Sequence, residues 1–266
     1  MSTPLILLTN DDGIHSPGLA AAAEALLPLG KLVIAAPLHQ QTSMGRAQTG
    51  NPEAKFEPVP YTVNGTVVEA YSLEASPAAV VRHFFMVMCG RVPALVVAGI
   101  NYGENIGLGV TSSGTVGAAL EAAMRGSPAL AMSLETDVND QHAYTEQDWA
   151  GSIHFTRYFA EAILRKGCMA KGVDVLKVEV PAGADAATSW RMTRLSPFMY
   201  YNSTVTNPCL ETRRKDIMFC KRQGDGEPDD TDAFAVRTAR VVAVTPLSLN
   251  LTARAPFDAV TSWIKD

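Results

Sequence analysis

The chain has 266 residues, of which 47% are hydrophobic and 18% charged, a composition that excludes wholesale disorder. Its 22 basic and 27 acidic residues give a net charge of −5, so the surface has no general attraction for nucleic-acid polymers or anionic membranes. The four cysteines form no Cys-x-x-Cys pair, and no apolar stretch has the length of a membrane span. We therefore expect a soluble, cytoplasmic protein.

The N-terminus has the pattern of a βαβ unit. Residues 5–8 form a continuous apolar run of strand length, followed by the turn sequence Asn-Asp-Asp-Gly at 10–13. Residues 19–29 are rich in alanine and leucine and predict a helix, with Ser16 as its N-terminal cap. Residues 31–36 predict the second strand. A crossover of this kind is almost always right-handed.

The middle of the chain repeats this alternation of strands and helices. The sequence Asn64-Gly65 predicts a hairpin within 53–72, and a glycine-rich loop is expected over 99–114. Strands are predicted over 94–98, 129–134 and 173–180, and helices over 76–88, 116–125 and 147–166. The pattern predicts an α/β fold, a Rossmann-like three-layer αβα arrangement around a mostly parallel sheet.

The C-terminal part has a different character. Short β-prone pieces at 192–195 and 236–244 flank a charged stretch, 221–232, which we interpret as an exposed loop or arm. A short helix is predicted over 257–264. We divide the chain into a core, 1–190, and an extension, 191–266, which carries an oligomerisation arm, a final strand and a helix. The sequence Asp230-Thr231-Asp232 within the arm is expected to serve a turn or an interface rather than a metal.

Three predicted strands are followed by polar side chains. The first strand leads to Asn10, Asp11 and Asp12, the second to Thr42 and Ser43, and the third to Asn101. The carboxyl ends of parallel strands share one edge of a sheet, where ligands bind in open α/β folds. Adjacent carboxylates repel unless a cation lies between them, and oxygen donors suit Mg²⁺ or Mn²⁺. Asn-Asp-Asp-Gly alone is also simply a good turn, but the combination favours a metal site.

A second candidate site precedes the helix predicted over 116–125. Ser113, Gly114 and Thr115 lie where the backbone N–H groups of a helix N-terminus can bind an anion, although ordinary capping explains the same residues. The chain contains neither a P-loop nor a dinucleotide-binding glycine fingerprint. A metal facing an anion site at one sheet edge indicates a phosphate ester as ligand.

These motifs resemble the SurE family of metal-dependent survival-protein nucleotidases. The matching pieces occur in the same order along the whole chain: Leu7-Leu8-Thr9-Asn10-Asp11-Asp12-Gly13, Ala36-Pro37 with Gln41-Thr42, Gly99-Ile100-Asn101-Tyr102-Gly103-Glu104-Asn105, Ser113-Gly114-Thr115-Val116, Asp230-Thr231-Asp232 and Val244-Thr245-Pro246-Leu247.

The resemblance implies one divalent metal ion held by Asp11, Asp12, Asn101 and the hydroxyl that follows Ala-Pro. Counting from Pro37 places Thr42 at that hydroxyl position, with Ser43 as the alternative. The implied reaction is hydrolysis of nucleoside 5′-monophosphates, or of 3′-monophosphates, by a metal-activated water, with Asp11 and Asp12 as the catalytic residues.

The resemblance also implies where the substrate binds and how the chain assembles. The phosphate would be bound by Asn10, Asn105, Ser113, Gly114 and Thr115. A homodimer or homotetramer is expected, with a C-terminal extension exchanged between subunits. The alternative is a catalytically silent nucleotide-binding oligomer, which would not need the paired aspartates.

Overall fold

A nine-stranded mixed sheet organises the protein in the computed structural model, which describes residues 3–88, 90, 92–137, 144–222 and 226–265. Six neighbouring strands are parallel, and the strands beyond them at the two edges run the other way. In spatial order the strands are β10 (Trp190–Met192), β13 (Val242–Leu247), β9 (Val175–Val180), β8 (Ala129–Leu134), β7 (Leu95–Tyr102), β1 (Leu5–Thr9), β2 (Lys31–Pro37), β6 (Glu69–Leu73) and β3 (Glu57–Pro58).

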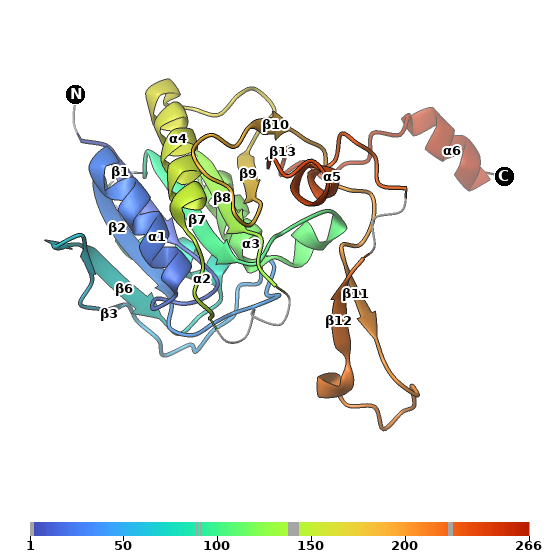
Figure 1. The fold of residues 1–266 in the computed structure, drawn as a ribbon, viewed down its shortest axis with the longest axis horizontal. Coiled ribbons are helices and arrows are strands. Elements are labelled where there is room, and N and C mark those ends of the chain that lie inside the picture. Colours follow the sequence, from blue (N-terminus) through green and yellow to red (C-terminus); the bar gives the residue numbers. More distant parts are fainter. Residues whose placement is uncertain (1–2, 89, 91, 138–143, 223–225, 266) are drawn as a thin grey trace.

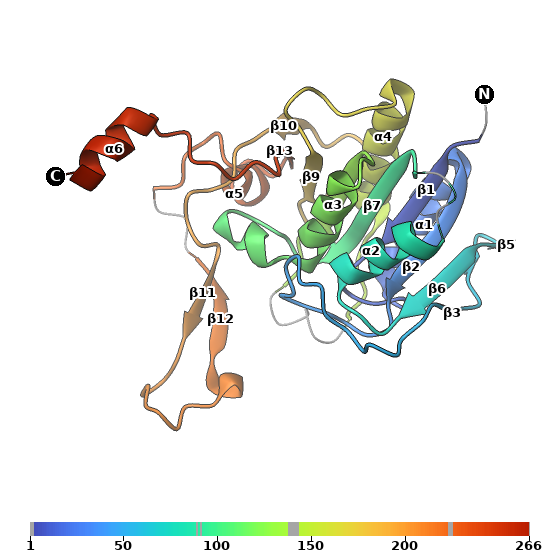
Figure 2. The same ribbon diagram turned by 180° about the vertical axis from the view of Figure 1, so that it is seen from behind.

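Helices cover both faces of this sheet (Figures 1 and 2). Ile6 and Leu8 of β1 pack toward α1 (Pro17–Leu26) and α4 (Ala150–Lys166), whereas Leu7 packs toward α2 (Pro77–Val87) and α3 (Gly114–Met124). Successive side chains of a strand point to opposite faces, so an unbroken apolar run supplies both cores. The predicted three-layer fold is confirmed.

Several local predictions are also confirmed. The Ser16 hydroxyl accepts a hydrogen bond from Leu19 N at 3.2 Å and so caps α1. Asn64 and Gly65 both adopt positive φ and join β4 (Thr62–Val63) to β5 (Thr66–Val67), as a two-residue hairpin requires.

Strand β7 is longer than predicted and corrects the start of the expected glycine-rich loop. The strand continues through 99–102, with a shift in its pairing with β8 between Ala98 and Asn101. Glycine weakened the strand pattern locally, but pairing with two neighbouring strands maintains the extended backbone. Asn101 therefore lies within a strand at the sheet edge, rather than in the loop.

The C-terminal part of the chain adds two strands to the sheet and also forms a separate hairpin. Strands β10 and β13 extend the sheet beyond β9, whereas β11 (Tyr201–Thr204) and β12 (Met218–Lys221) form a hairpin that projects from the body (Figure 1). Helix α6 (Phe257–Lys265) lies away from the core and has no buried residue. Within the described residues, no helix combines the length and apolar composition that crossing a membrane requires.

Two predictions about this part were wrong in detail. Val236 lies in helix α5 (Asp232–Arg237) rather than in a strand, because it packs beside β13 in a buried cluster with Ala243. Thr231 caps this helix by accepting a hydrogen bond from Phe234 N at 3.3 Å. The stretch 221–232 is not an exposed loop at its end, since Thr231 and Asp232 are buried. Residues 223–225 of the stretch lie outside the described part of the chain.

Candidate functional site

Two adjacent carboxylates lie buried where β1 ends. The exposed fractions of Asp11 and Asp12 are only 6% and 7%. Asp12 Oδ2 accepts a hydrogen bond from Tyr102 N at 2.9 Å, and its Oδ1 accepts one from Gln40 Nε2 at 3.3 Å. The backbone of β7 and the loop after β2 therefore fix the carboxylate of Asp12 from two sides.

Asp11 is held by the N-terminus of α3. The Thr115 hydroxyl donates a short hydrogen bond to Asp11 Oδ1 and lies 3.1 Å from Asn101 Oδ1. Asn101 Nδ2 donates to Gly103 O at 2.6 Å, which turns its amide oxygen toward Thr115. An added Cβ on Gly114 would lie 2.7 Å from Asp11 Cβ and Oδ2, so only glycine fits beside this carboxylate.

Burial makes the charged form of both aspartates costly. Desolvation raises the pKa of Asp11 to about 6, against the lowering effect of hydrogen bonds from Thr115 and from the backbone of Gly114. Desolvation, together with the charge of Asp11, raises the pKa of Asp12 to about 7. Perturbed pairs of this kind gather at functional sites, and a bound cation would remove the repulsion.

The donor set at this edge fits a hard divalent cation. Asp11, Asp12 and Asn101 supply carboxylate and amide oxygens, which Mg²⁺ and Mn²⁺ prefer, with water completing the coordination. Within the described residues, no group of three or more His, Cys, Asp or Glu side chains could hold a metal. A cation here would therefore depend on the amide, hydroxyl and water oxygens beside the two carboxylates.

A cation site makes a testable prediction about stability and pH. Both carboxyls bind protons more tightly in the folded protein than in the unfolded chain, so without metal the free energy of unfolding should fall as pH rises from about 4 to about 7. Mn²⁺ binds the ionised carboxylates, so it should raise Tm more at about pH 8 than at about pH 5. Differential scanning fluorimetry at both pH values, with Mn²⁺ or EDTA, measures this. A Tm that Mn²⁺ leaves unchanged at the higher pH would contradict a cation site.

Thr42 and Ser43 lie in the loop that follows β2. Both are exposed, and Ser43 has a φ of 62°. Their neighbour Gln41 donates its backbone N–H to Asp11 O at 2.7 Å, so the loop is anchored beside the first aspartate. The fold therefore brings this loop to the edge of the sheet where Asp11 lies.

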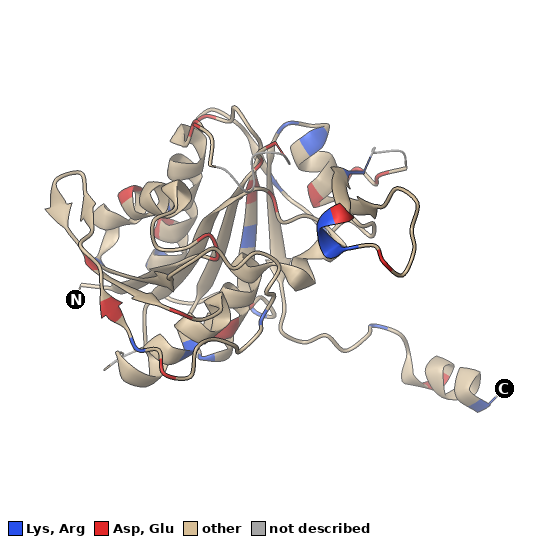
Figure 3. Cartoon of the chain, turned by 90° about the horizontal axis from the view of Figure 1, so that it is seen from below, with Lys and Arg blue, Asp and Glu red and all other residues tan. Residues whose placement is uncertain are grey.

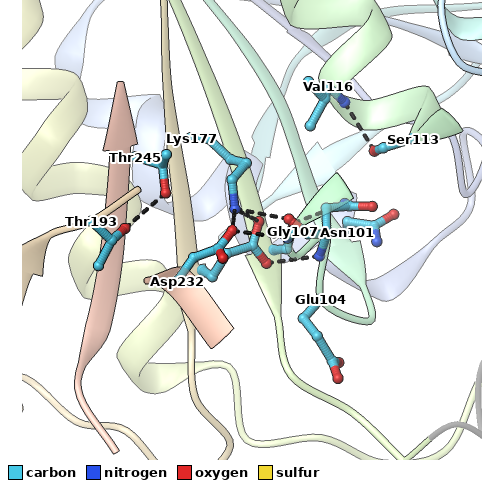
Figure 4. A network of polar contacts seen from close by, with 12 residues as sticks. Asn101, Glu104, Gly107, Ser113, Val116, Lys177, Thr193, Asp232 and Thr245 are labelled. Carbon is cyan, nitrogen blue, oxygen red and sulfur yellow. Dashed lines mark hydrogen bonds and ion pairs between the residues drawn. The ribbon is translucent and has the colours of Figure 1, made fainter. Parts of the chain in front are cut away.

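Asn10 and Ser113, both expected to bind phosphate, have local structural roles. Asn10 is fully buried, and its amide donates to Gly13 O at 2.9 Å and to Ser16 Oγ at 2.8 Å. The Ser113 hydroxyl accepts from Val116 N at 3.1 Å, as an ordinary cap of α3 (Figure 4). Asn10 builds the turn that carries the aspartates, and Ser113 begins the helix that supports Asp11.

Asn105 lies at the other side of this edge and is half-buried. Its amide nitrogen donates to Ser133 Oγ at 3.0 Å. An amide has two N–H donors, so this bond leaves one for a ligand oxygen.

Several contacts at the site were not foreseen from the sequence. Tyr144 donates its hydroxyl to Asp12 O at 2.8 Å, and its ring packs edge-on against Tyr102 with the centroids 5.2 Å apart. Lys177, Glu179 and Asp232 form a fully buried ion cluster beside Asn105, and Figure 4 labels Lys177 and Asp232 of this cluster. The sequence signal that could have revealed this cluster is the presence of charged residues at 177 and 179 within an otherwise apolar strand.

The comparisons with known proteins agree with this arrangement. Residues 6–202 match the family model described as Survival protein SurE. The 5′-nucleotidase SurE of Methanocella arvoryzae is 39% identical over 93% of both chains, and that of Thermococcus gammatolerans is 38% identical over 95% of this chain and 93% of its own. The crystal structure of the SurE protein from Aquifex aeolicus superposes with a TM-score of 0.75 at 25% identity, covering 99% of this chain and all of the other. The chain therefore belongs to the SurE survival-protein family.

Proposed function

We propose that this protein is a 5′-nucleotidase that hydrolyses nucleoside 5′-monophosphates, or the 3′-monophosphates, with one divalent cation, Mg²⁺ or Mn²⁺. The observation that carries the proposal is the pair of buried aspartates, which meet Asn101 and Thr115 at the carboxyl edge of the parallel strands. The activity named for the relatives supports the same reaction class.

Each residue of the site has a defined part in this reaction. Asp11, Asp12 and Asn101 would hold the cation, which when bound supplies a water of lowered pKa and neutralises charge on the phosphoryl oxygens. Tyr102 N fixes Asp12, and Thr115 fixes Asp11, so the acceptors are oriented before substrate arrives. Asn105, with its second amide N–H, would bind a phosphoryl oxygen of the substrate and so contribute to substrate affinity.

One assay separates this proposal from a silent nucleotide-binding protein. The purified protein is incubated with AMP and Mn²⁺, and adenosine and inorganic phosphate are quantified over time. We expect equal amounts of both products, and the same assay with 3′-AMP reports positional preference. Binding of AMP without product release would favour the silent alternative instead.

The two hydroxyls after β2 give a further prediction. We propose Thr42 as the hydroxyl that completes the cation site, since counting from Pro37 places it at the family's position. Thr42→Ala should raise the Mn²⁺ concentration for half-maximal activity by about tenfold, as expected for one lost ligand, whereas Ser43→Ala should leave it unchanged. Mn²⁺ titration of activity decides between them. The reverse pattern would assign the role to Ser43.

We also propose that the protein assembles into a homodimer or homotetramer through its projecting segments. Exposed apolar side chains lie on the β11–β12 hairpin and on α6, at Leu210, Met218, Phe219, Phe257, Trp263 and Ile264. Large apolar groups on segments that leave the body need a surface to cover them, and a second copy of the chain would supply it.

Light scattering tests this assembly. The intact chain should have the mass of a dimer or tetramer, and replacing residues 202–219 by a short Gly/Ser linker should lower the mass. This replacement spares Tyr200 and Lys221, which bind Glu104 at 2.7 and 2.5 Å. A monomeric and fully active intact protein would contradict the assembly.

We propose that residues 1–190 carry the active site and that residues 191–266 supply the arm. A cytoplasmic location is supported by Cys168, Cys209 and Cys220, which are exposed and free of disulfides. Acidic and basic residues are interspersed over the chain (Figure 3), so neither a nucleic-acid polymer nor a membrane is proposed as a partner.

A further inference from the structure

A buried ion cluster joins the end of the sheet to the loop that carries Asn105. Lys177, Glu179 and Asp232 are all fully buried. The ammonium group of Lys177 lies 3.2 Å from Glu179 Oε1 and 3.0 Å from Asp232 Oδ2, and donates its third bond to Asn105 O at 2.8 Å. All three donors of the lysine are thus used, and only one of them by the loop.

The carboxylates of the cluster bind the same loop. Glu179 Oε2 accepts a hydrogen bond from Asn105 N at 2.9 Å, and Asp232 Oδ2 accepts one from Gly107 N at 3.1 Å. Together with the lysine bond, three charge-assisted hydrogen bonds hold the backbone of Asn105 and Gly107. The cluster is thus directed at the backbone on both sides of the Asn105 side chain.

The same loop is held a second time from the C-terminal part. The carboxylate of Glu104 is fully buried, and its Oε1 accepts from Tyr200 Oη at 2.7 Å and lies 2.5 Å from Lys221 Nζ. Tyr200 and Lys221 lie at the base of the projecting hairpin, and Asp232 begins α5. Residues distant in sequence therefore fix 104–107 from β9, from α5 and from the arm.

We propose that Lys177, Glu179 and Asp232 are positioning residues, which hold Asn105 so that its amide meets the substrate phosphate. The proposal rests on the proposed nucleotidase function. A buried group of one cation and two anions is weak evidence for added stability, because desolvation offsets the attraction. The hydrogen bonds from the cluster to the loop backbone give the three charged residues a structural role, which is to fix the position of Asn105. A contact made equally in the ground and transition states lowers KM and leaves kcat unchanged.

Asp232→Asn tests the role with little change of shape. Asp232 Oδ2 accepts from Lys177 and Gly107 N, and Oδ1 accepts from Ser196 N at 2.8 Å and Ala233 N at 2.9 Å, so an asparagine amide must turn its own N–H toward one of these donors. We expect KM for AMP to rise about 5- to 10-fold with kcat within about twofold and the Mn²⁺ requirement unchanged. Amide hydrogen exchange of residues 105–107 should become faster.

Thr245→Val is the matched control. It removes a buried hydrogen bond between the hydroxyls of Thr193 and Thr245 at 2.8 Å (Figure 4), on the residue that pairs with Lys177 in the sheet, and leaves the hydrogen bonds between the cluster and the loop in place. This variant should lose stability without any change in KM or in the exchange of 105–107. Glu179→Gln, which alters the acceptor of Asn105 N, provides the same measurement if Asp232→Asn does not fold.

The outcomes separate this inference from the function on which it rests. A raised KM in Asp232→Asn or Glu179→Gln, absent from Thr245→Val, supports the positioning role. An unchanged KM beside normal wild-type turnover overturns it and leaves the nucleotidase function standing. A wild-type protein that releases no phosphate from AMP overturns the proposed nucleotidase function itself, whatever the rate of amide hydrogen exchange at residues 105–107.

Discussion

Replacing Asp12 by asparagine is expected to lower kcat for AMP hydrolysis by about 10²–10⁴-fold. The substitution keeps the size of the side chain but removes a charged oxygen donor from a site where the cation depends on two carboxylates. The neutral amide also relieves the repulsion with Asp11, so Tm of the metal-free protein should rise. Steady-state phosphate release and a thermal melt of the same preparation measure both effects.

A matched control removes a carboxylate elsewhere. Glu161 is exposed on α4, and Glu161→Gln should retain wild-type kcat and Tm. Gain of stability with loss of activity in Asp12→Asn is the pattern of a functional site whose charges oppose folding. An Asp12→Asn protein with wild-type kcat at saturating Mn²⁺ would remove this aspartate from the mechanism.

The second large effect is expected from a single methyl group. Gly114→Ala places a Cβ 2.7 Å from Asp11 Cβ and Oδ2, where neither the start of α3 nor the buried aspartate can move freely. Displacing a catalytic group by even about 1 Å costs on the order of 10²-fold, so kcat should fall by about that factor. The Mn²⁺ concentration needed for half-maximal activity should rise as well.

Gly109→Ala is the natural comparison for this variant. Gly109 lies five residues earlier in the short helical turn Leu108–Ser112, and an added Cβ there meets no atom within 4 Å. The same chemical change should therefore leave kcat and metal dependence as in the wild type. Equal kinetics of the two variants would mean that the approach of Gly114 to Asp11 has no part in catalysis.

Local signals in the sequence predicted much of this fold. The cap at Ser16 and the hairpin at Asn64-Gly65 act within a few residues, and the unbroken apolar run 5–8 indicates a strand buried on both faces from its composition alone. The continuation of β7 through 99–102 and the helix at Val236 depend on distant partners: two neighbouring strands for the first, and packing beside β13 for the second. Patterns of residue type do not record such partners.

The candidate site divides in the same way. Asp11, Asp12 and Asn101 were predicted together because the ends of parallel strands share one edge, and the structure brings the first and last to Thr115. In the ion cluster, Asp232 joins Lys177 and Glu179, which lie more than fifty positions earlier in the chain, and no spacing rule connects such residues. The charges of the cluster were visible in the sequence, but their burial was not.

Removal and return of the metal test whether the buried aspartates hold a cation that the reaction requires. The protein is dialysed against EDTA, transferred to metal-free buffer, and assayed for phosphate release from AMP before and after addition of Mn²⁺ or Mg²⁺. We expect no measurable release without metal, recovery on addition in the wild type, and no recovery in Asp12→Asn. Undiminished release in EDTA would contradict a reaction that depends on a cation held by these buried aspartates.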